Sequence, residues 1–345
     1  NHIKGRVGTW FQDFWKRLRL NLFLQLWLMP LTAWFYYEIP VYALFLNLLV
    51  IPLCGWLLGF GVLGAVVGMK LPVCSKWILI LCHWILNIYE TGIDLTDRLP
   101  GHLWITGQPS MKLLIVYHFG KKWNLYSKIR SVFAGICVAC FALCLLVPPK
   151  DLSGIYFLDV GQGDGIVVET GQGAYLFDCG STSRKNIGEY VLKPYLKSRG
   201  ISSLRGVFVS HPDEDHMNGV LELMENGEEW GITAEQLFLP AIRESERRET
   251  FEQLLAAAED AGIPVSYIKC GDEIRDSQLR LLCLHPEENT TLADANAYSE
   301  CFYVEVFAKK MKQEAIDDRK ANDASGASAI GKISILLTGD VEGEG

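Results

Sequence analysis

Hydrophobic residues form long, nearly uninterrupted runs in the first 150 residues and short, spaced runs after that point. A helix needs about 20 apolar residues to cross the roughly 30 Å hydrocarbon core of a membrane. The pattern therefore predicts a polytopic α-helical membrane domain in residues 1–150 and a separate, soluble domain in residues 151–345. The predicted crossings are residues 20–37, 41–69, 73–89, 101–119 and 131–147. The run within 101–119 is short, so we expect a broken or re-entrant crossing there.

Glycines in the second predicted crossing fall in pairs four residues apart, Gly55 with Gly59 and Gly64 with Gly68. Small residues at this spacing allow two helices to approach closely. The alternative is a helix broken around a conduit, because irregular backbone at membrane depth usually lines a cavity. Intramembrane polar side chains would then line the conduit. The candidates for this lining are Asn47, His83 and Asn87.

Basic residues orient the crossings, because cytoplasmic loops carry an excess of Lys and Arg. With all five crossings counted, every basic cluster falls on the cytoplasmic side. The acidic loop 90–108 and everything after Pro148 then lie outside the cytoplasm. We therefore expect a multi-pass protein of the cell (inner) membrane with an extracytoplasmic second domain. The clusters are Lys4 to Arg19, Lys70 with Lys76, and Lys121 to Arg130.

The second domain alternates short strand-like runs with amphipathic helical segments, which indicates a mixed α/β layered fold. The glycine-rich turn GQGDG leads from one strand into another rather than into a helix, so we expect a hairpin and not a nucleotide cradle. Residues 309–331 are polar and rich in small residues, typical of a disordered insertion. The predicted strands are 155–160, 165–169, 174–178, 204–210, 279–285, 299–308 and 332–338, and the predicted helices are 185–200, with a kink at Pro194, and 246–261.

Charge differs sharply between the two domains. Residues 1–150 hold 14 Lys and Arg against 5 Asp and Glu, whereas residues 151–345 hold 18 against 35. An acidic domain repels phosphate, which excludes a DNA-binding domain that relies on a basic surface. Among the ten cysteines, Cys137 and Cys140 have CxxC spacing, but they lie inside the apolar run 131–147, and no cysteines have zinc-finger spacing. We therefore expect no disulfide framework. DNA would be held through metal ions, a delivering partner, or local basic residues: Arg184, Lys185, Lys193, Lys197 and Arg199.

The stretch SHPDEDHMNG directly follows a predicted buried strand. A solvated acidic loop is one interpretation, but two histidines flanking two aspartates are typical metal ligands. His211 and Asp213 alternate along an extended segment and can face one site, while Asp215 and His216 begin a helix and can face a second. Asp340 ends the apolar run ILLTGD and is a candidate bridging carboxylate. Two adjacent ions would neutralise charge that develops on a phosphate.

The segments LDVGQGDGIVVET, YLFDCGS, VFVSHPDEDHMNG and SILLTGD, in this order, resemble the metallo-β-lactamase-like domain of the ComEC family of competence DNA-uptake proteins. The run FYYEIPVYALFLNLLVIPLCGWLLGFGVLGAVVG resembles the competence transmembrane domain that precedes it in this family. The resemblance covers nearly the whole chain and implies an α/β metallo-β-lactamase-like (αββα) fold for the second domain. It further implies a channel that passes single-stranded DNA into the cytoplasm, and an extracytoplasmic nuclease domain that degrades the other strand.

The same resemblance assigns two divalent metal ions, Mn²⁺ or Zn²⁺ with Mg²⁺ as a further option. His211 and Asp213 would hold one ion, Asp215 and His216 the other, and Asp340 would bridge both. Asp215, His216 and Asp340 would also carry the catalytic roles. Asp213 stands where most enzymes of this fold have histidine, and its harder oxygen favours Mn²⁺ or Mg²⁺ alongside Zn²⁺.

Two further acids are expected near this site. Asp178 ends a strand and would orient the ligand loop. Asp164, in the GQGDG turn, either faces the site or is only a turn residue. The expected partners are DNA, membrane lipid and competence proteins that deliver DNA, and the chain could form an oligomer.

The chain begins without methionine and ends five residues after Asp340. We therefore expect a fragment whose second domain is truncated at its C-terminus, without the downstream histidine motif of the family and with an incomplete metal shell. Two alternatives stay open: a membrane-anchored metallo-hydrolase of another phosphoester, and a transporter whose lactamase-like domain is inactive.

Overall fold

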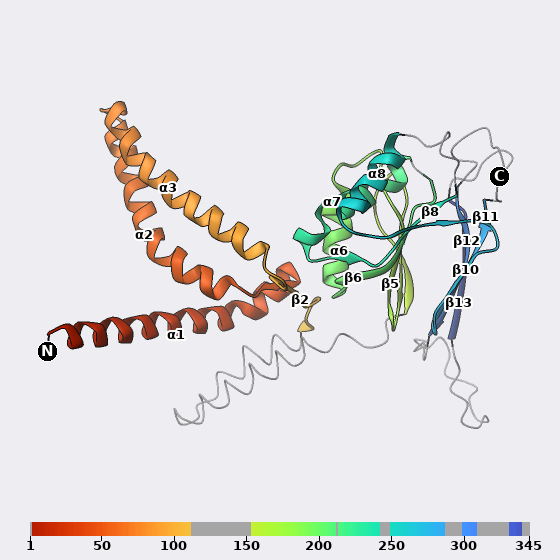
Figure 1. Cartoon of the computed structure of the whole chain (residues 1–345), viewed down its shortest axis with the longest axis horizontal. Coiled ribbons are helices and arrows are strands. Elements are labelled where there is room, and N and C mark those ends of the chain that lie inside the picture. The colour runs from red at the N-terminus through yellow and green to blue at the C-terminus, as the bar shows by residue number, and fades with distance from the viewer. Residues whose placement is uncertain are drawn as a thin grey trace, which may run out of the picture. The chain divides into compact units, whose positions relative to one another are not determined.

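The computed structural model describes residues 2–111, 153–211, 213–241, 249–286, 299–308 and 331–339. The chain divides into two compact units, Asn1–Leu145 and Leu146–Gly345 (Figure 1). Three features predicted above therefore lie outside the described residues: the crossing 131–147, nearly all of the insertion 309–331, and Asp340.

The first unit is helical, with one small sheet. It contains the helices α1 (His2–Tyr36), α2 (Ala43–Gly68) and α3 (Pro72–Asp97), and the antiparallel strands β1 (Glu38–Pro40) and β2 (Leu103–Ile105). Within the described residues, two helices have the length and apolar composition of a membrane span, α2 and α3. These two correspond to the predicted crossings 41–69 and 73–89.

Two predictions for this unit need correction. α3 continues to Asp97, so the first part of the segment predicted as loop 90–108 is helical. A helix tolerates Glu90, Asp94 and Asp97 there because all three carboxylates are exposed. Residues 103–105 form a strand and 106–110 have no regular structure, so the described part of the predicted crossing 101–119 is not a helix.

The close helix approach predicted for Gly64 and Gly68 is confirmed. A Cβ on Gly64 would lie 2.8 Å from Leu79 Cδ2, and one on Gly68 would lie 3.0 Å from Ser75 Oγ. The Ser75 hydroxyl donates to the Gly64 carbonyl across 2.8 Å, which joins α2 to α3. Gly55 and Gly59, by contrast, have open space around the position of a Cβ. The polar candidates for a conduit lining are divided: Asn47 contacts Gln25 of α1, whereas Asn87 and His83 contact each other on the exposed side of α3.

The second unit is a three-layer α/β/β structure in its described part (Figure 1). The first sheet has the order β3-β4-β5-β6-β8-β9, with β7 beside β6. Its first pairs are antiparallel hairpins, and the pairs from β5 to β9 are parallel. The strands are β3 (Gly154–Phe157), β4 (Gly165–Thr170), β5 (Gly173–Cys179), β6 (Ser203–Phe208), β7 (Thr233–Ala234), β8 (Leu237–Pro240) and β9 (Val265–Ile268).

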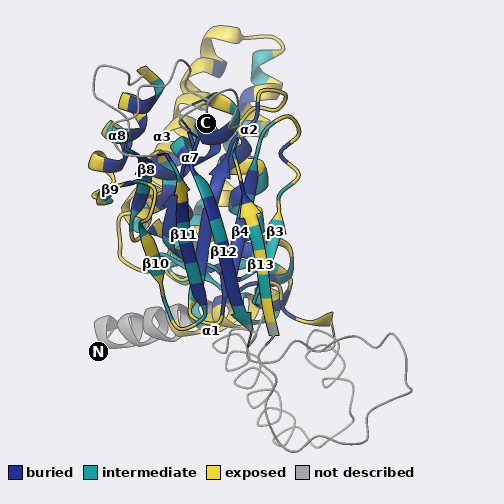
Figure 2. Ribbon diagram, turned by 90° about the vertical axis from the view of Figure 1, so that its right-hand side faces the viewer, coloured by how far each residue is buried: buried dark blue, intermediate teal, exposed yellow. Residues whose placement is uncertain are grey.

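Helices cover one face of this sheet, and the second sheet packs on the other. The helical layer comprises the short π-helical turn η1 (Gly188–Leu192), α6 (Lys193–Ser198), α7 (Glu214–Trp230) and α8 (Glu249–Asp260). The second sheet is antiparallel, in the order β10 (Glu273–Arg275), β11 (Leu279–His285), β12 (Cys301–Ala308) and β13 (Gly331–Leu337). Buried residues run along β11 and β12, and exposed ones along β13 (Figure 2).

Aromatic residues fill the space between the two sheets. Phe177 and Phe208 stack with their ring centroids 4.6 Å apart, and Phe302 of the second sheet meets both rings edge-on. Such pairs add about 0.5–1.5 kcal/mol beyond the burial of their surface. Phe177 and Phe208 lie at the carboxyl ends of β5 and β6, so the cluster supports the loops that follow these strands.

The predicted strands and helices of the second unit are all present where the structure describes them. The predicted helix 185–200 differs in detail, because it begins as the turn η1 and Pro194 lies in the first turn of α6. A proline is accommodated there without a kink, since its missing N–H would have no helical partner. The strands β7, β8, β9 and β10 were not predicted; each has only two to four residues.

Candidate metal centre

The two histidines of the motif lie between the end of β6 and the first turn of α7. Asp213 has an extended backbone and precedes the helix, and its carbonyl accepts the N–H groups of His216 and Met217 at 3.0 and 3.1 Å. Glu214 and Asp215 occupy the first turn, where the helix dipole favours negative charge. The local sequence thus turns the chain from strand to helix within a few residues, with His211 and His216 buried on either side of the turn.

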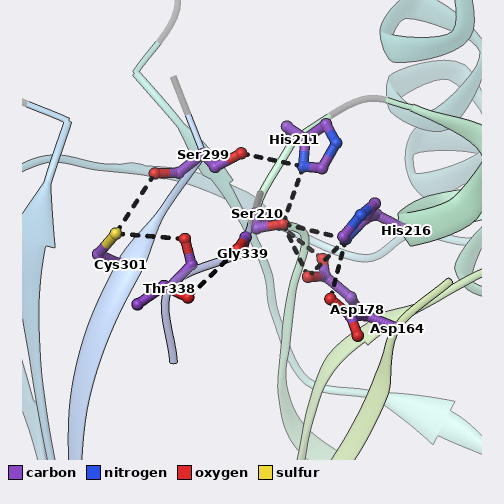
Figure 3. Close-up of polar contacts among 9 residues, drawn as sticks. All are labelled: Asp164, Asp178, Ser210, His211, His216, Ser299, Cys301, Thr338 and Gly339. Carbon is purple, nitrogen blue, oxygen red and sulfur yellow. Dashed lines mark hydrogen bonds and ion pairs between the residues drawn. The ribbon is translucent and has the colours of Figure 1, made fainter. Parts of the chain in front are cut away.

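Within the described residues, two groups of side chains could hold a metal ion. His211, Asp215 and His216 form the first, and Asp164, Asp178 and His216 form the second; in each group the ligand atoms lie within 4.8 Å of one another. The two imidazole rings have their centroids 3.9 Å apart (Figure 3). His216 belongs to both groups, so the two positions would be adjacent.

Hydrogen bonds orient both imidazoles through the same ring atom. His216 Nδ1 lies 3.1 Å from Asp178 Oδ2 and 3.4 Å from Ser210 Oγ. His211 Nδ1 lies 3.1 Å from Ser210 Oγ and 3.2 Å from Ser299 Oγ (Figure 3). A hydrogen bond at one ring nitrogen that orients the imidazole is the arrangement seen for histidines that bind metals. Two buried imidazoles held this way beside carboxylates fit a divalent ion.

Asp178 anchors this arrangement at the end of β5. Its carboxylate accepts the backbone N–H and the hydroxyl of Ser210, both at 2.7 Å. Its backbone has a φ of 51°, a left-handed conformation that costs a non-glycine residue about 1–3 kcal/mol. Strain of this size is maintained where the surroundings fix the residue, and here the carboxylate is bound to Ser210 and His216 at once.

The GQGDG turn brings Asp164 to the same place. The Asp164 N–H donates to the Asp215 carbonyl at 3.0 Å, and the Gly180 N–H donates to the Asp164 carbonyl at 2.9 Å. A Cβ on Gly163 would lie 2.4 Å from the Gly180 carbonyl oxygen and 2.5 Å from that of Asp215, at a φ of +146°. Only glycine allows this close approach. The GQGDG turn therefore joins the start of β4 to the first turn of α7, and we call this connection the strap.

The predicted site residues divide into three sets. His211, Asp215, His216, Asp178 and Asp164 lie together. Asp213 belongs to neither of these groups, and the pairing of His211 with Asp213 stays a prediction. Asp340 lies outside the described residues.

Sequence reasoning missed three residues around the histidines: Ser210, Ser299 and Glu300. Ser210 is part of the motif SHPDEDHMNG, but its hydrogen bonds to Asp178 form because β6 pairs with β5. Glu300 carried a usable signal, since it has the same strand parity as Phe302, Val304 and Val306, which are all buried. A charged residue in such a row is uncommon.

Two family models match the chain. Residues 1–130 match the model described as "Competence protein", and residues 158–267 match the metallo-beta-lactamase superfamily. The chain is also similar to ComE operon protein 3 of Bacillus subtilis (strain 168), with 23% identity over 354 residues. That alignment covers 94% of this chain and 41% of the relative, so the chain spans less than half of the relative's length.

Similar solved structures include the human tRNase Z short form and YhfI, a metallo-beta-lactamase fold protein of Bacillus subtilis. They are 14% and 13% identical to the chain, and they cover 44% and 45% of it and 64% and 54% of their own chains. Their TM-scores are 0.27 and 0.26.

Proposed function

We propose that the chain belongs to the ComEC family and acts in DNA uptake during natural competence, since residues 1–130 match the competence-protein model and residues 158–267 match the metallo-beta-lactamase superfamily. In this proposal the first domain passes single-stranded DNA across the cell membrane. The second domain, residues 151–345, is a metal-dependent nuclease outside the cytoplasm that degrades the strand left behind.

The convergence of His211, Asp215 and His216 is the observation that carries the enzymatic part of the proposal. A solvated acidic loop would not bury two histidines with their Nδ1 atoms bound to Ser210, Ser299 and Asp178. These residues would hold two divalent ions, with Asp164 on the second side and Asp340 as the proposed bridge. The carboxylate oxygens suit Mn²⁺ and Mg²⁺, and the imidazole nitrogens suit Zn²⁺.

A divalent ion bound here would lower the pKa of a water and neutralise charge on a phosphate. The protein's own residues do the positioning. Asp178 and Ser210 fix the plane of the His216 ring, and Ser210 with Ser299 fixes that of His211. The Asp164 backbone holds the first turn of α7, which places Asp215 beside both rings.

The basic residues considered for DNA contact are mostly committed elsewhere. Arg199 binds Glu169 through two hydrogen bonds of 2.8 and 2.6 Å, and Lys197 is buried. Lys193 lies over the Trp230 ring, 5.3 Å from its centroid. Arg184 and Lys185 lie on the loop beside the GQGDG turn, where the Arg184 guanidinium donates to the Asp159 carbonyl and pairs with the Asp159 carboxylate. An exposed ion pair of this kind contributes little to stability, so a phosphate can replace it. We propose that Arg184 and Lys185 guide the phosphate backbone toward the histidines.

We also propose that the first domain is a multi-pass membrane domain, with the basic clusters in the cytoplasm. The candidate spans α2 and α3 and the match to the competence model support this. Proteins that deliver DNA, membrane lipid and further copies of the chain are the partners that such a domain would need.

The deciding experiment uses the full chain in detergent micelles, stripped of metal and then supplied with Mn²⁺, Zn²⁺ or Mg²⁺. Single- and double-stranded DNA are offered as substrates. We expect metal-dependent cleavage that Asp215→Ala abolishes and Glu214→Ala retains; Glu214 is the exposed neighbour of Asp215 in the same helical turn and lies outside both ligand groups.

Other outcomes would change the assignment. Metal binding without cleavage of either DNA would point to another phosphoester substrate. Absence of metal binding would leave a transporter with an inactive lactamase-like domain. Equal cleavage by the Asp215→Ala protein would refute the proposed catalytic group.

A further inference from the structure

Glu300 is a buried acid that belongs to neither of the two ligand groups described above. It directly precedes β12, is 1% exposed, and neither of its carboxyl oxygens has a hydrogen-bond partner in the described part of the chain. Its parity with Phe302 directs the side chain between the two sheets. An ionised carboxyl in such a place costs several kcal/mol unless something neutralises it.

The backbone fixes Glu300 next to the histidines. Its N–H donates to the Ser210 carbonyl at 3.0 Å, and its neighbour Ser299 contacts His211 Nδ1. β12 is therefore joined to the end of β6 at the residue that precedes His211.

A cavity of about 230 Å³ lies beside Glu300. Three carboxylates and a hydroxyl line its polar side: Asp164, Asp178, Glu300 and Ser210. The rest of its lining is mostly aromatic and aliphatic, and the lining includes no Lys or Arg. A water occupies roughly 30 Å³ of liquid, so the cavity has room for an ion with part of its hydration shell.

Burial, and then the charge of Asp178, raises the pKa of the Glu300 carboxyl well above its usual range. A proton could neutralise Glu300 alone, but Asp164 and Asp178 would still face the same cavity with their negative charge. A divalent cation would compensate all three groups at once. Oxygen donors without nitrogen or sulfur are the preference of Mg²⁺, Ca²⁺ and Mn²⁺.

We propose that this cavity binds a hard divalent cation through Glu300, Asp178 and Asp164. The site shares Asp164 and Asp178 with the second of the two ligand groups, and Glu300 supplies a third oxygen donor there. This inference rests on the proposed position of that second ion, but it does not depend on nuclease activity.

The test is the number of Ca²⁺ ions bound per chain, because Ca²⁺ selects oxygen donors over imidazole. Metal-free full-length chain in detergent micelles is dialysed to equilibrium against Ca²⁺. We expect the Glu300→Gln protein to lose one ion per chain relative to the unsubstituted protein. Glu305→Gln is the matched control: Glu305 lies on the same strand, but its partners are Lys332 and Arg280, and it should bind the full number.

A His211→Ala/His216→Ala protein separates this site from the proposed nuclease, since it should lose Zn²⁺ but retain the Ca²⁺ that depends on Glu300. Thermal unfolding checks the fold: without Ca²⁺, Glu300→Gln should be at least as stable as the unsubstituted protein, because it removes an unpaired buried acid. Equal Ca²⁺ binding by the Glu300→Gln protein, or no Ca²⁺ binding by any of these proteins, would overturn the proposal.

Discussion

At the scale of single residues, Asp178 does most to organise the centre. It binds the Ser210 backbone, the Ser210 hydroxyl and His216 Nδ1 with one carboxylate. A carboxylate bound to one nitrogen of an imidazole sets the orientation in which the other nitrogen can bind a metal.

We predict that Asp178→Asn weakens Mn²⁺ binding by about 10–100-fold, because an amide cannot accept all three contacts. Competition with a fluorescent chelator measures the affinity of the full chain. Asp159→Asn serves as the control, since Asp159 is exposed and paired with Arg184. Unchanged affinity in the Asp178→Asn protein would mean that Ser210 alone holds the ring.

Tyr175 gives a pH dependence that is independent of metals. Burial, and then its hydrogen bond to Asp276, raises the pKa of Tyr175 from 10.0 to about 12. The hydroxyl is neutral below its pKa, so its stabilising contribution is complete below the unfolded value of 10.0 and is lost as the pH rises through about 12.

We therefore expect the resistance of the second unit to proteolysis in urea to fall between pH 10 and 12. In Tyr175→Phe this fall should be shallower, although the protein should be less stable at neutral pH because it lacks the hydrogen bond to Asp276. A fall of the same steepness in both proteins would assign the pH dependence to other groups.

Residue patterns predicted the histidine centre because its ligands are local. His211, Asp215 and His216 come from one short stretch, and a strand-to-helix turn suffices to bring them together. The sequence could not identify the other members of the centre, Ser210, Ser299 and Glu300, because their contacts depend on the register between β5, β6 and β12. Register is a tertiary property, which alternation within one strand does not determine.

At the scale of elements, the strap formed by the GQGDG turn is the contact most sensitive to a single atom. We predict that Gly163→Ala destabilises the second unit by about 3 kcal/mol or more, from backbone strain together with a clash against two carbonyl groups. Proteolysis in urea gives the loss of stability, and the chelator assay should show weaker Mn²⁺ binding.

Gly262→Ala is the matched control for this substitution. Gly262 also has a positive φ, but nothing lies within 4 Å of the position of its Cβ. Only the strain of about 1–2 kcal/mol should appear there, with no change in metal binding. Equal losses in the two proteins would show that the clash at Gly163 relaxes freely.

The elements that the sequence predicted correctly are mostly those with a long, clear apolar face. β11 matches its predicted range, and α8 ends one residue before its predicted end. β8 to β10 are too short for periodicity to rise above the surrounding loops. α3 continues past its apolar segment because exposed charged residues extend the helix to Asp97. Hydropathy alone predicts a loop at such charged residues.

At the scale of the whole molecule, the acidic second unit is proposed to lie outside the cytoplasm. Cys270 tests this, because it is exposed whereas Cys179 and Cys283 of the same unit are buried. In intact spheroplasts, a membrane-impermeant maleimide should label the chain, and Cys270→Ser should abolish most of that label. Labelling that requires permeabilised membranes would place the unit in the cytoplasm.

Ser210 has a consequence for the timing of activity during synthesis. The same residue holds both imidazoles and, through its carbonyl, receives the N–H of Glu300 from a strand that is made some 90 residues later. Until that late strand docks, His211 also lacks the Ser299 hydroxyl. A half-made chain emerging from the ribosome would thus carry the ligand motif without the aligned rings, so the proposed metal centre would form only when the fold is complete.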